Sequence, residues 1–268
     1  MTTPPSFATP LTPARYLALF RADGERLADV AGAHGLQAAV PSCPGWTVGD
    51  VVAHTSDVYR RQAAVIRLGR RPTAGEWQQS PAGGSLGWFR ASLRAMLDEL
   101  AGREPASAAH TRWPQDPTVG FWYRRMALET VVHRVDVEQA VGVRTPVDAA
   151  LAVDGIDEVL TVFLRDSWAG VSEDGWGELR PEDGADRTVA VRAGGAAWRC
   201  HLHPAAVDVT RATDAEQVRD WPADAAIGGE PSAVLLWLWG RAPDDAVGLT
   251  GDADVLRAFR GRVRIATQ

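Results

Sequence analysis

The stretch FWYRRMALETVVHRVDVEQAV, residues Phe121–Val141, contains neither proline nor glycine and is followed directly by Gly142. Its apolar residues recur at intervals of three and four, which is the period of an α-helix with one buried face. A glycine placed just after such a run is a common end signal for a helix. The stretch therefore predicts a long helix. The fold then depends on which other elements of the chain this helix packs against.

Further helix patterns flank this stretch, and most begin with a residue that can cap a helix. The patterns before it run from Thr12 to Gly32, from Thr47 to about Leu68 and from Ser85 to Ala101. A fifth pattern begins at Asp148 and reaches about Trp168. Four long helices in succession, with a fifth added, predict a helical bundle.

The second half of the chain follows a different period. After an acidic, glycine-rich stretch come the short runs TVAVRA, AWRCHLH and VDVTRA, which read as β-strands. Two late helix patterns begin at Pro231 and Asp252. We therefore predict an α+β protein with two domains, a helical bundle over residues 1–170 and a small α+β domain over residues 171–268.

Composition excludes several classes of partner. The formal net charge is −6, and no basic cluster stands alone, so we expect no nucleic-acid partner and no anionic membrane partner. No run approaches the ~18 apolar residues of a membrane span, and the N-terminal residues lack the pattern of a signal peptide. Two distant cysteines suit a reducing compartment. We expect a cytoplasmic monomer or homodimer that acts on small molecules.

Three residues with metal-ligating side chains interrupt the apolar faces of two predicted helices. His54 shares a face with Val51 and Val58, while Glu129 and His133 lie one turn apart on the stretch quoted above. A core histidine bonded to a backbone carbonyl would explain His54 alone, and a Glu129–His133 ion pair would explain the other two. A divalent metal held by all three explains the whole set.

The chemistry of this set favours a catalytic metal site. Two imidazoles and one carboxylate leave a fourth position open for water or substrate. Zinc suits these ligand types best, with iron, nickel and manganese as alternatives. The sequence His-Glu-x-x-His of helical metalloproteases does not occur in the chain. We therefore do not expect that kind of hydrolysis.

Several motifs together resemble a known family. The segments CPGWTVGDVVAH at 43–54, ETVVHRVDVEQAVG at 129–142, PSAVLLWLWGR at 231–241 and LTGDADVLRAF at 249–259 are similar to the mycothiol-dependent maleylpyruvate isomerase family. The resemblance implies a DinB-like metal-binding four-helix bundle followed by a sterol-carrier-like α+β domain. It matches His54, Glu129 and His133 to the metal ligands of the family, and it implies mycothiol as cosubstrate.

The resemblance leads to a leading hypothesis and two rivals. A metal-activated thiolate of mycothiol would add to a small electrophile similar to maleylpyruvate, which makes the protein an isomerase or an S-transferase. The first rival is a non-catalytic protein that binds a small molecule and holds a structural or vestigial metal. The second rival is a helical interaction module in which Glu129 and His133 form a buried pair without metal.

Further residues are candidates for supporting roles. Asp136, three residues after His133, is expected to orient this ligand from the second coordination shell. Trp122 lies on the same helix face as Glu129 and is expected to wall the pocket. Arg90 and Arg241 are the candidates for binding an anionic substrate or thiol.

Two other motifs attract attention but are not predicted to be sites. Cys43 precedes the second helix in a Pro-Gly turn with no base nearby in the sequence, so we expect it to pack in the loop. In the run Cys200–His203, alternation places Cys200 opposite to His201 and His203. We expect these two histidines to face solvent rather than to bind a second metal.

Overall fold

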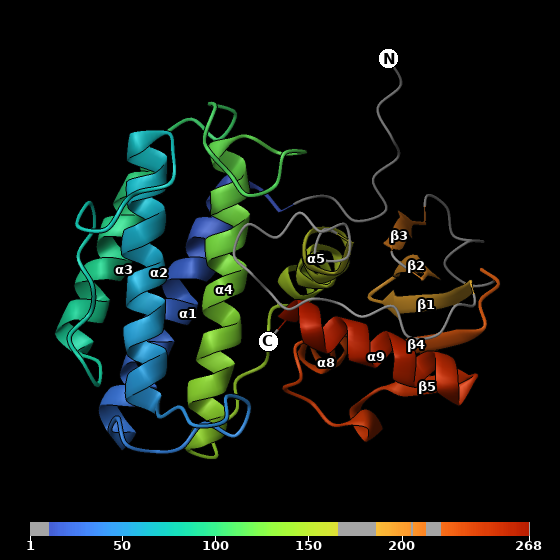
Figure 1. Cartoon of the computed structure of the whole chain (residues 1–268). Helices are drawn as coiled ribbons and strands as arrows, with labels where there is room; N and C mark the ends of the chain where they lie inside the picture. The colour runs from blue at the N-terminus through green and yellow to red at the C-terminus, as the bar shows by residue number, and fades with distance from the viewer. Residues whose placement is uncertain (1–10, 166–185, 205, 213–220, 268) are drawn as a thin grey trace. The chain divides into compact units, whose positions relative to one another are not determined.

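The computed structural model describes residues 11–165, 186–204, 206–212 and 221–267, and it divides into two compact units. One unit, Thr12–Thr145, is a bundle of helices that lie side by side in Figure 1. Its helices are α1 (Pro13–His34), α2 (Val48–Leu68), α3 (Leu86–Ala101) and α4 (Val119–Ala140). The predicted four-helix bundle is therefore confirmed.

The ends of these helices follow the capping signals in the sequence. The hydroxyl of Thr47 accepts a hydrogen bond from the amide of Asp50, and the carboxylate of Asp50 accepts one from the amide of Thr47. This reciprocal capping box fixes where α2 begins. Helix α1 differs from the prediction, because it continues through Gly32 to His34 and ends before Gly35. Glycine is tolerated inside a helix when its neighbours keep the helical period.

The bundle core is built from large apolar side chains of all four helices. Phe20, Tyr59, Phe89 and Met126 are fully or almost fully buried. Complete burial of each such side chain stabilises the fold by about 1.5–3 kcal/mol. Phe20 and Phe89 both lie against the ring of Tyr59, at centroid distances of 5.2 and 5.8 Å. Through these contacts Tyr59 of α2 links side chains of α1 and α3 in the core.

A close backbone approach fixes the start of α2. A Cβ atom on Gly49 would collide with the carbonyl oxygen of Gly83, and one on Gly84 would collide with the carbonyl oxygen of Gly49. Gly84 also has a φ of +77°, a conformation that favours glycine. The loop before α3 therefore crosses the first turn of α2 at a distance that only glycine allows.

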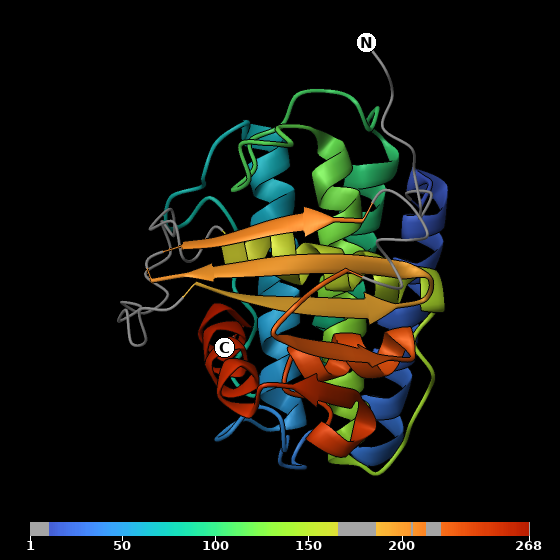
Figure 2. The same cartoon turned by 90° about the vertical axis from the view of Figure 1, so that its right-hand side faces the viewer.

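The other unit, from Pro146 onwards, combines a sheet with helices. Among the described residues the sheet has five strands in the order β3-β2-β1-β4-β5, seen side by side in Figure 2. Strands β1 and β4 are parallel, and the other neighbouring pairs are antiparallel. The elements are α5 (Ala149–Glu158), a π-helix (Val159–Leu164), β1 (Arg187–Ala193), β2 (Ala196–His203), β3 (Ala206–Arg211), β4 (Ala225–Gly229), α8 (Pro231–Leu238), a short 3₁₀-helix (Asp244–Ala246), β5 (Gly248–Gly251) and α9 (Ala253–Thr267).

The α+β fold class with two domains is thus confirmed, whereas the sterol-carrier-like assignment stays a prediction. The first three strands and both late helices lie where the sequence predicts them. Strands β4 and β5 were not predicted. Their sequences, AAIGG and GLTG, hold few of the β-branched and aromatic residues that signal a strand.

The predicted boundary between residues 170 and 171 lies outside the described residues. The two units divide between Thr145 and Pro146, which places α5 in the same unit as the sheet. The indole of Trp198 on β2 donates a hydrogen bond of 2.8 Å to Asp157 of α5, a contact that ties this helix to the sheet. The predicted continuation of this helix to Trp168 also ends outside the described residues.

Among the described residues, no helix combines the length and the apolar character needed to cross a membrane.

Candidate metal centre

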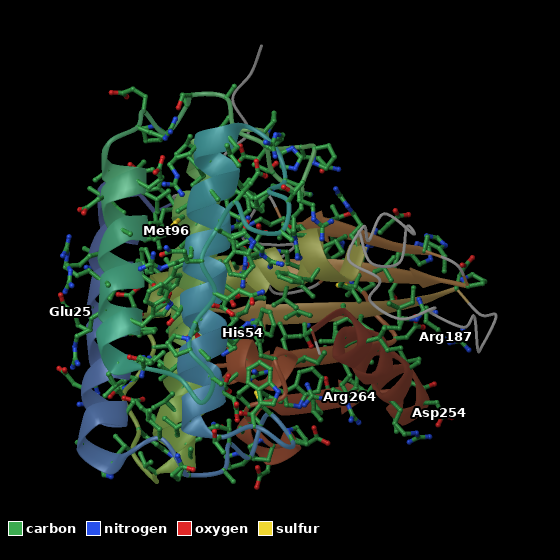
Figure 3. All side chains as sticks on the ribbon, turned by 60° about the vertical axis from the view of Figure 1, so that its left-hand side comes forward. Glu25, His54, Met96, Arg187, Asp254 and Arg264 are labelled. Atoms are coloured by element: carbon green, nitrogen blue, oxygen red, sulfur yellow. The ribbon has the colours of Figure 1, made fainter. Side chains whose placement is uncertain are left out.

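The three residues singled out in the sequence lie together in the bundle. His54 projects from α2, where Figure 3 labels it, and Glu129 and His133 project from α4. One potential ligand atom from each side chain lies within 4.8 Å of those of the other two. We call these residues, His54, Glu129 and His133, the bundle site. A single ion can contact three donor atoms at this spacing.

The two carboxylate oxygens of Glu129 have different partners. Oε1 faces both histidines, at 3.2 Å from Nε2 of His133 and 3.5 Å from Nε2 of His54. Oε2 accepts a short hydrogen bond from the guanidinium of Arg125, one turn earlier on α4. The side chains of Arg125 and Glu129 are 7% and 14% exposed. The arginine thus neutralises the carboxylate through one oxygen and leaves the other oxygen facing the imidazoles.

The charges of the bundle site are coupled. Burial alone would raise the pKa of Glu129, but the charge of Arg125 and hydrogen bonds from His133 and His54 hold this pKa well below its usual value. For His133, burial opposes protonation, but hydrogen bonds to Asp136 and Glu129 raise its pKa to about 9. Without a metal, the site therefore holds an ionised Glu129 and a protonated His133 at neutral pH. A metal ion would have to displace that proton.

Asp136 supports His133 from behind. Its Oδ2 accepts a hydrogen bond of 2.9 Å from Nδ1 of His133, which leaves Nε2 pointing at Glu129. The carboxylate is fully buried, and its other oxygen accepts a bond of 2.5 Å from the hydroxyl of Ser42. The thiol of Cys43 lies 3.8 Å from Oδ2. The hydrogen bond from His133 to Asp136 is of the kind that metal-ligating histidines usually make through their second ring nitrogen.

His54 is more exposed than the sequence pattern predicts. Val51 and Val58 are buried as expected, but 40% of the side chain of His54 is exposed. Its ring lies between two others, with centroids 5.1 Å from Trp46 and 5.0 Å from His133. The residue sits at the edge of the apolar stripe, so one side of the bundle site faces outward. A ligand that binds from solvent needs such an opening.

The remaining candidates have other partners among the described residues. The guanidinium of Arg90 on α3 lies 3.1 Å from Asp29 of α1. Trp122 is buried on α4 and donates a hydrogen bond of 2.9 Å to the carbonyl of His110. Arg241 belongs to the other unit, where it donates to the carbonyl of Trp239. Their predicted roles in binding substrate or thiol stay predictions.

Sequence reasoning missed Arg125, Trp46 and Ser42. Arg125 could have been found, because a basic residue four positions from Glu129 lies next to it on a helix. Trp46 and Ser42 precede α2 in a loop, and no helical period relates a loop residue to α4. Their contacts with His54 and Asp136 depend on how the loop folds back through the hydrogen bond from Val40 to Trp46.

Comparison with known proteins supports the resemblance found in the motifs. Residues 17–138 match the family model described as the mycothiol maleylpyruvate isomerase N-terminal domain, so this part of the chain is similar to that DinB-like family. The match includes all residues of the bundle site and ends before α5. Searches of curated proteins and of solved structures gave no match.

Proposed function

We propose that the protein is a metal-dependent enzyme that uses mycothiol as cosubstrate and acts as an isomerase or S-transferase on a small electrophile similar to maleylpyruvate. His54, Glu129 and His133 would hold the metal, and zinc suits their donor atoms best. The observation that carries the proposal is the convergence of these side chains, whose ligand atoms lie within 4.8 Å of one another. The family match of residues 17–138 supports the choice of thiol and substrate class.

The residues around the bundle site fit a divalent ion. Both histidines direct Nε2 toward Oε1 of Glu129, and Asp136 fixes the orientation of His133. Arg125 occupies the second oxygen of Glu129, so Oε1 is the oxygen available as a ligand. Because the pKa of Glu129 is held well below its usual value, the carboxylate is already ionised at neutral pH. Three protein ligands are typical of catalytic zinc, which keeps a further position for an exchangeable ligand.

A divalent metal bound there would remove the proton of a coordinated thiol, whose pKa is otherwise about 8.5, and so supply a thiolate able to attack an activated double bond. If the new carbon–sulfur bond breaks again after rotation, the product is the geometric isomer. If the bond persists and the neighbouring carbon takes a proton, the product is a thioether. The residues of the bundle site favour neither outcome.

The chain's own residues have three tasks in this scheme. His54, whose side chain is 40% exposed, would supply the ligand on the outward side of the site, where a thiol from solvent would bind. Arg125 balances the charge of Glu129, which lowers the cost of keeping a carboxylate in a largely buried position. Asp136 accepts a hydrogen bond from Nδ1 of His133 and so keeps Nε2 directed at the site.

The test is a thiol-dependent assay on zinc-loaded protein without a polyhistidine tag, with mycothiol and maleylpyruvate as substrates. We expect turnover that requires both zinc and mycothiol, that is lost in His54→Ala, and that survives in His34→Ala, whose histidine is exposed at the end of α1. Zinc binding without any thiol-dependent reaction of this or related electrophiles would instead support a non-catalytic binding protein. Turnover that is insensitive to metal removal would contradict the proposal.

A further inference from the structure

A second group of metal-ligating side chains lies on the sheet, far along the chain from the bundle site. His201 and His203 are two positions apart on β2, so they share one face of the sheet. Asp208 is the direct partner of His201 on β3, and Asp186 immediately precedes β1, whose first residue Arg187 pairs with Leu202. Arg187, labelled in Figure 3, marks this end of the sheet. We call Asp186, His201, His203 and Asp208 the sheet cluster.

The distances within the sheet cluster bring Asp186, His201 and His203 close together, while Asp208 lies at the other ring nitrogen of His203. The rings of His201 and His203 have centroids 4.0 Å apart. Nδ1 of His203 lies 3.0 Å from Asp186, and Nε2 of the same ring lies 3.0 Å from Asp208. One potential ligand atom from each of Asp186, His201 and His203 lies within 4.8 Å of those of the other two.

An ordinary ion pair accounts for only part of this arrangement. His203 with the two carboxylates would be a charged triad, but it gives no reason for the second imidazole to lie against the first. Two imidazoles and the carboxylate of Asp186 match the ligands that borderline divalent cations prefer. Asp208, bonded to the other ring nitrogen of His203, would orient this ligand. The sequence pattern predicts that the histidines face solvent, because alternation along β2 does not show that Asp186 and Asp208 lie beside them.

We propose that Asp186, His201 and His203 form a second binding site for a transition-metal dication such as Zn²⁺, with Asp208 orienting His203 through its other ring nitrogen. The ion would link the residue before β1 to strand β2 at one end of the sheet. The carboxylate side chains are 66% and 73% exposed, so the site is open to ions in solution. This proposal does not rest on the function proposed above, because it involves none of the residues of the bundle site.

The test measures zinc binding by equilibrium dialysis on the full chain without a tag. His54→Ala serves as the background, because it removes a ligand of the bundle site at a position that is 40% exposed and tolerates truncation. In this background we expect about one zinc per chain to remain bound. Adding His201→Ala should weaken that binding by more than the about 10- to 100-fold typical for loss of an outer-sphere partner. Adding His34→Ala, at an exposed histidine outside the cluster, should leave it unchanged.

A second readout separates binding at the sheet cluster from binding elsewhere. In the His54→Ala background, zinc should raise the melting temperature, because an ion that binds the folded state stabilises it. The rise should disappear when Asp186→Asn is added, a change at an exposed side chain that preserves shape. Either of two results would overturn the proposal: the background variant binds no zinc, or its zinc binding is unaffected by both His201→Ala and Asp186→Asn.

Discussion

The bundle site and the sheet cluster use the same kinds of side chain but in opposite surroundings. Glu129 and His133 are 14% and 11% exposed, whereas Asp186 and Asp208 are 66% and 73% exposed. A buried carboxylate needs a compensating charge, and the bundle supplies Arg125 for Glu129. The exposed carboxylates are stabilised by water. The supporting residues of a site therefore reflect how deeply it is buried.

The comparison predicts that the two sites respond differently to substitution. Loss of one charge in the bundle site leaves its partner in a poorly solvated position, whereas loss of one in the sheet cluster leaves its partner in water. The predictions below follow this contrast from the largest expected effect to the smallest.

The largest effect is expected for Glu129→Ala in metal-free protein. Removing this carboxylate takes away the neutralising partner of the largely buried Arg125 guanidinium, so we expect a loss of about 3 kcal/mol in the free energy of unfolding. Glu99→Ala is the matched control, since Glu99 is as buried as Glu129 and pairs at the same four-residue spacing with Arg103, which lies just beyond α3 and is 38% exposed. The control should cost less than about 1 kcal/mol. Urea unfolding measures both values, and equal costs would contradict the contrast.

A smaller effect is expected for Asp136→Asn on zinc affinity. A neutral amide cannot replace the negative charge of the carboxylate that accepts the hydrogen bond from Nδ1 of His133. The imidazole therefore becomes less basic and its orientation less fixed. We expect the dissociation constant for zinc at the bundle site to rise by about 10- to 100-fold. Competition with a chromogenic chelator gives this value. An unchanged affinity would mean that Asp136 serves packing alone.

The pH dependence of stability should distinguish the histidines of the two sites. The pKa of His133 is raised to about 9 in the metal-free fold, from an ordinary value of 6.5. Its charged form therefore stabilises the fold fully below about pH 6.5, and this contribution is lost as the pH rises toward about 9, by at most about 1.4 kcal/mol per pH unit. The difference in unfolding free energy between the native protein and His133→Gln should shrink across this range. A difference that is constant with pH would contradict the assignment.

The smallest effect is expected for the same substitution in the sheet cluster. Hydrogen bonds to Asp186 and Asp208 also raise the pKa of His203, so its stabilising charge is likewise lost with rising pH. Both carboxylates are largely exposed, however, and water screens their attraction for the imidazolium. We expect His203→Gln to change the unfolding free energy of metal-free protein by less than about 1 kcal/mol at any pH. If His203→Gln lowered the unfolding free energy as much as Glu129→Ala, the solvent exposure of a charged pair would not determine how much stability its loss costs.

How much the sequence reveals also differs between the two sites. Helical period and capping signals were sufficient to predict α2 and α4 and to place His54, Glu129 and His133 on facing helices, because a helix repeats its neighbours at fixed intervals. Those signals did not determine how exposed the side chain of His54 is, because this exposure depends on how the apolar face of α2 packs against the other helices. They also gave no access to Trp46, a loop residue.

The sheet was less predictable because strand pairing is a long-range property. Alternation placed His201 and His203 on one face, but the register that brings Asp208 opposite His201 is not visible in the run of residues itself. Strand β4 pairs with β1 through Ala and Gly residues whose intrinsic preference for strands is weak. The packing of α5 with the sheet was likewise not predictable. An amphipathic pattern shows that a helix has a buried face but not which element this face packs against.

The most direct test of the central claim is elemental analysis of tag-free protein beside its His133→Ala variant, both purified without added metal and then equilibrated with zinc at neutral pH. Convergence of His54, Glu129 and His133 on one ion predicts that the variant holds about one divalent ion per chain fewer than the native protein. Equal metal contents in the two proteins, or no metal in either, would contradict the claim. The buried contacts of Arg125, Glu129 and His133 would then be an ion-pair network that stabilises the bundle.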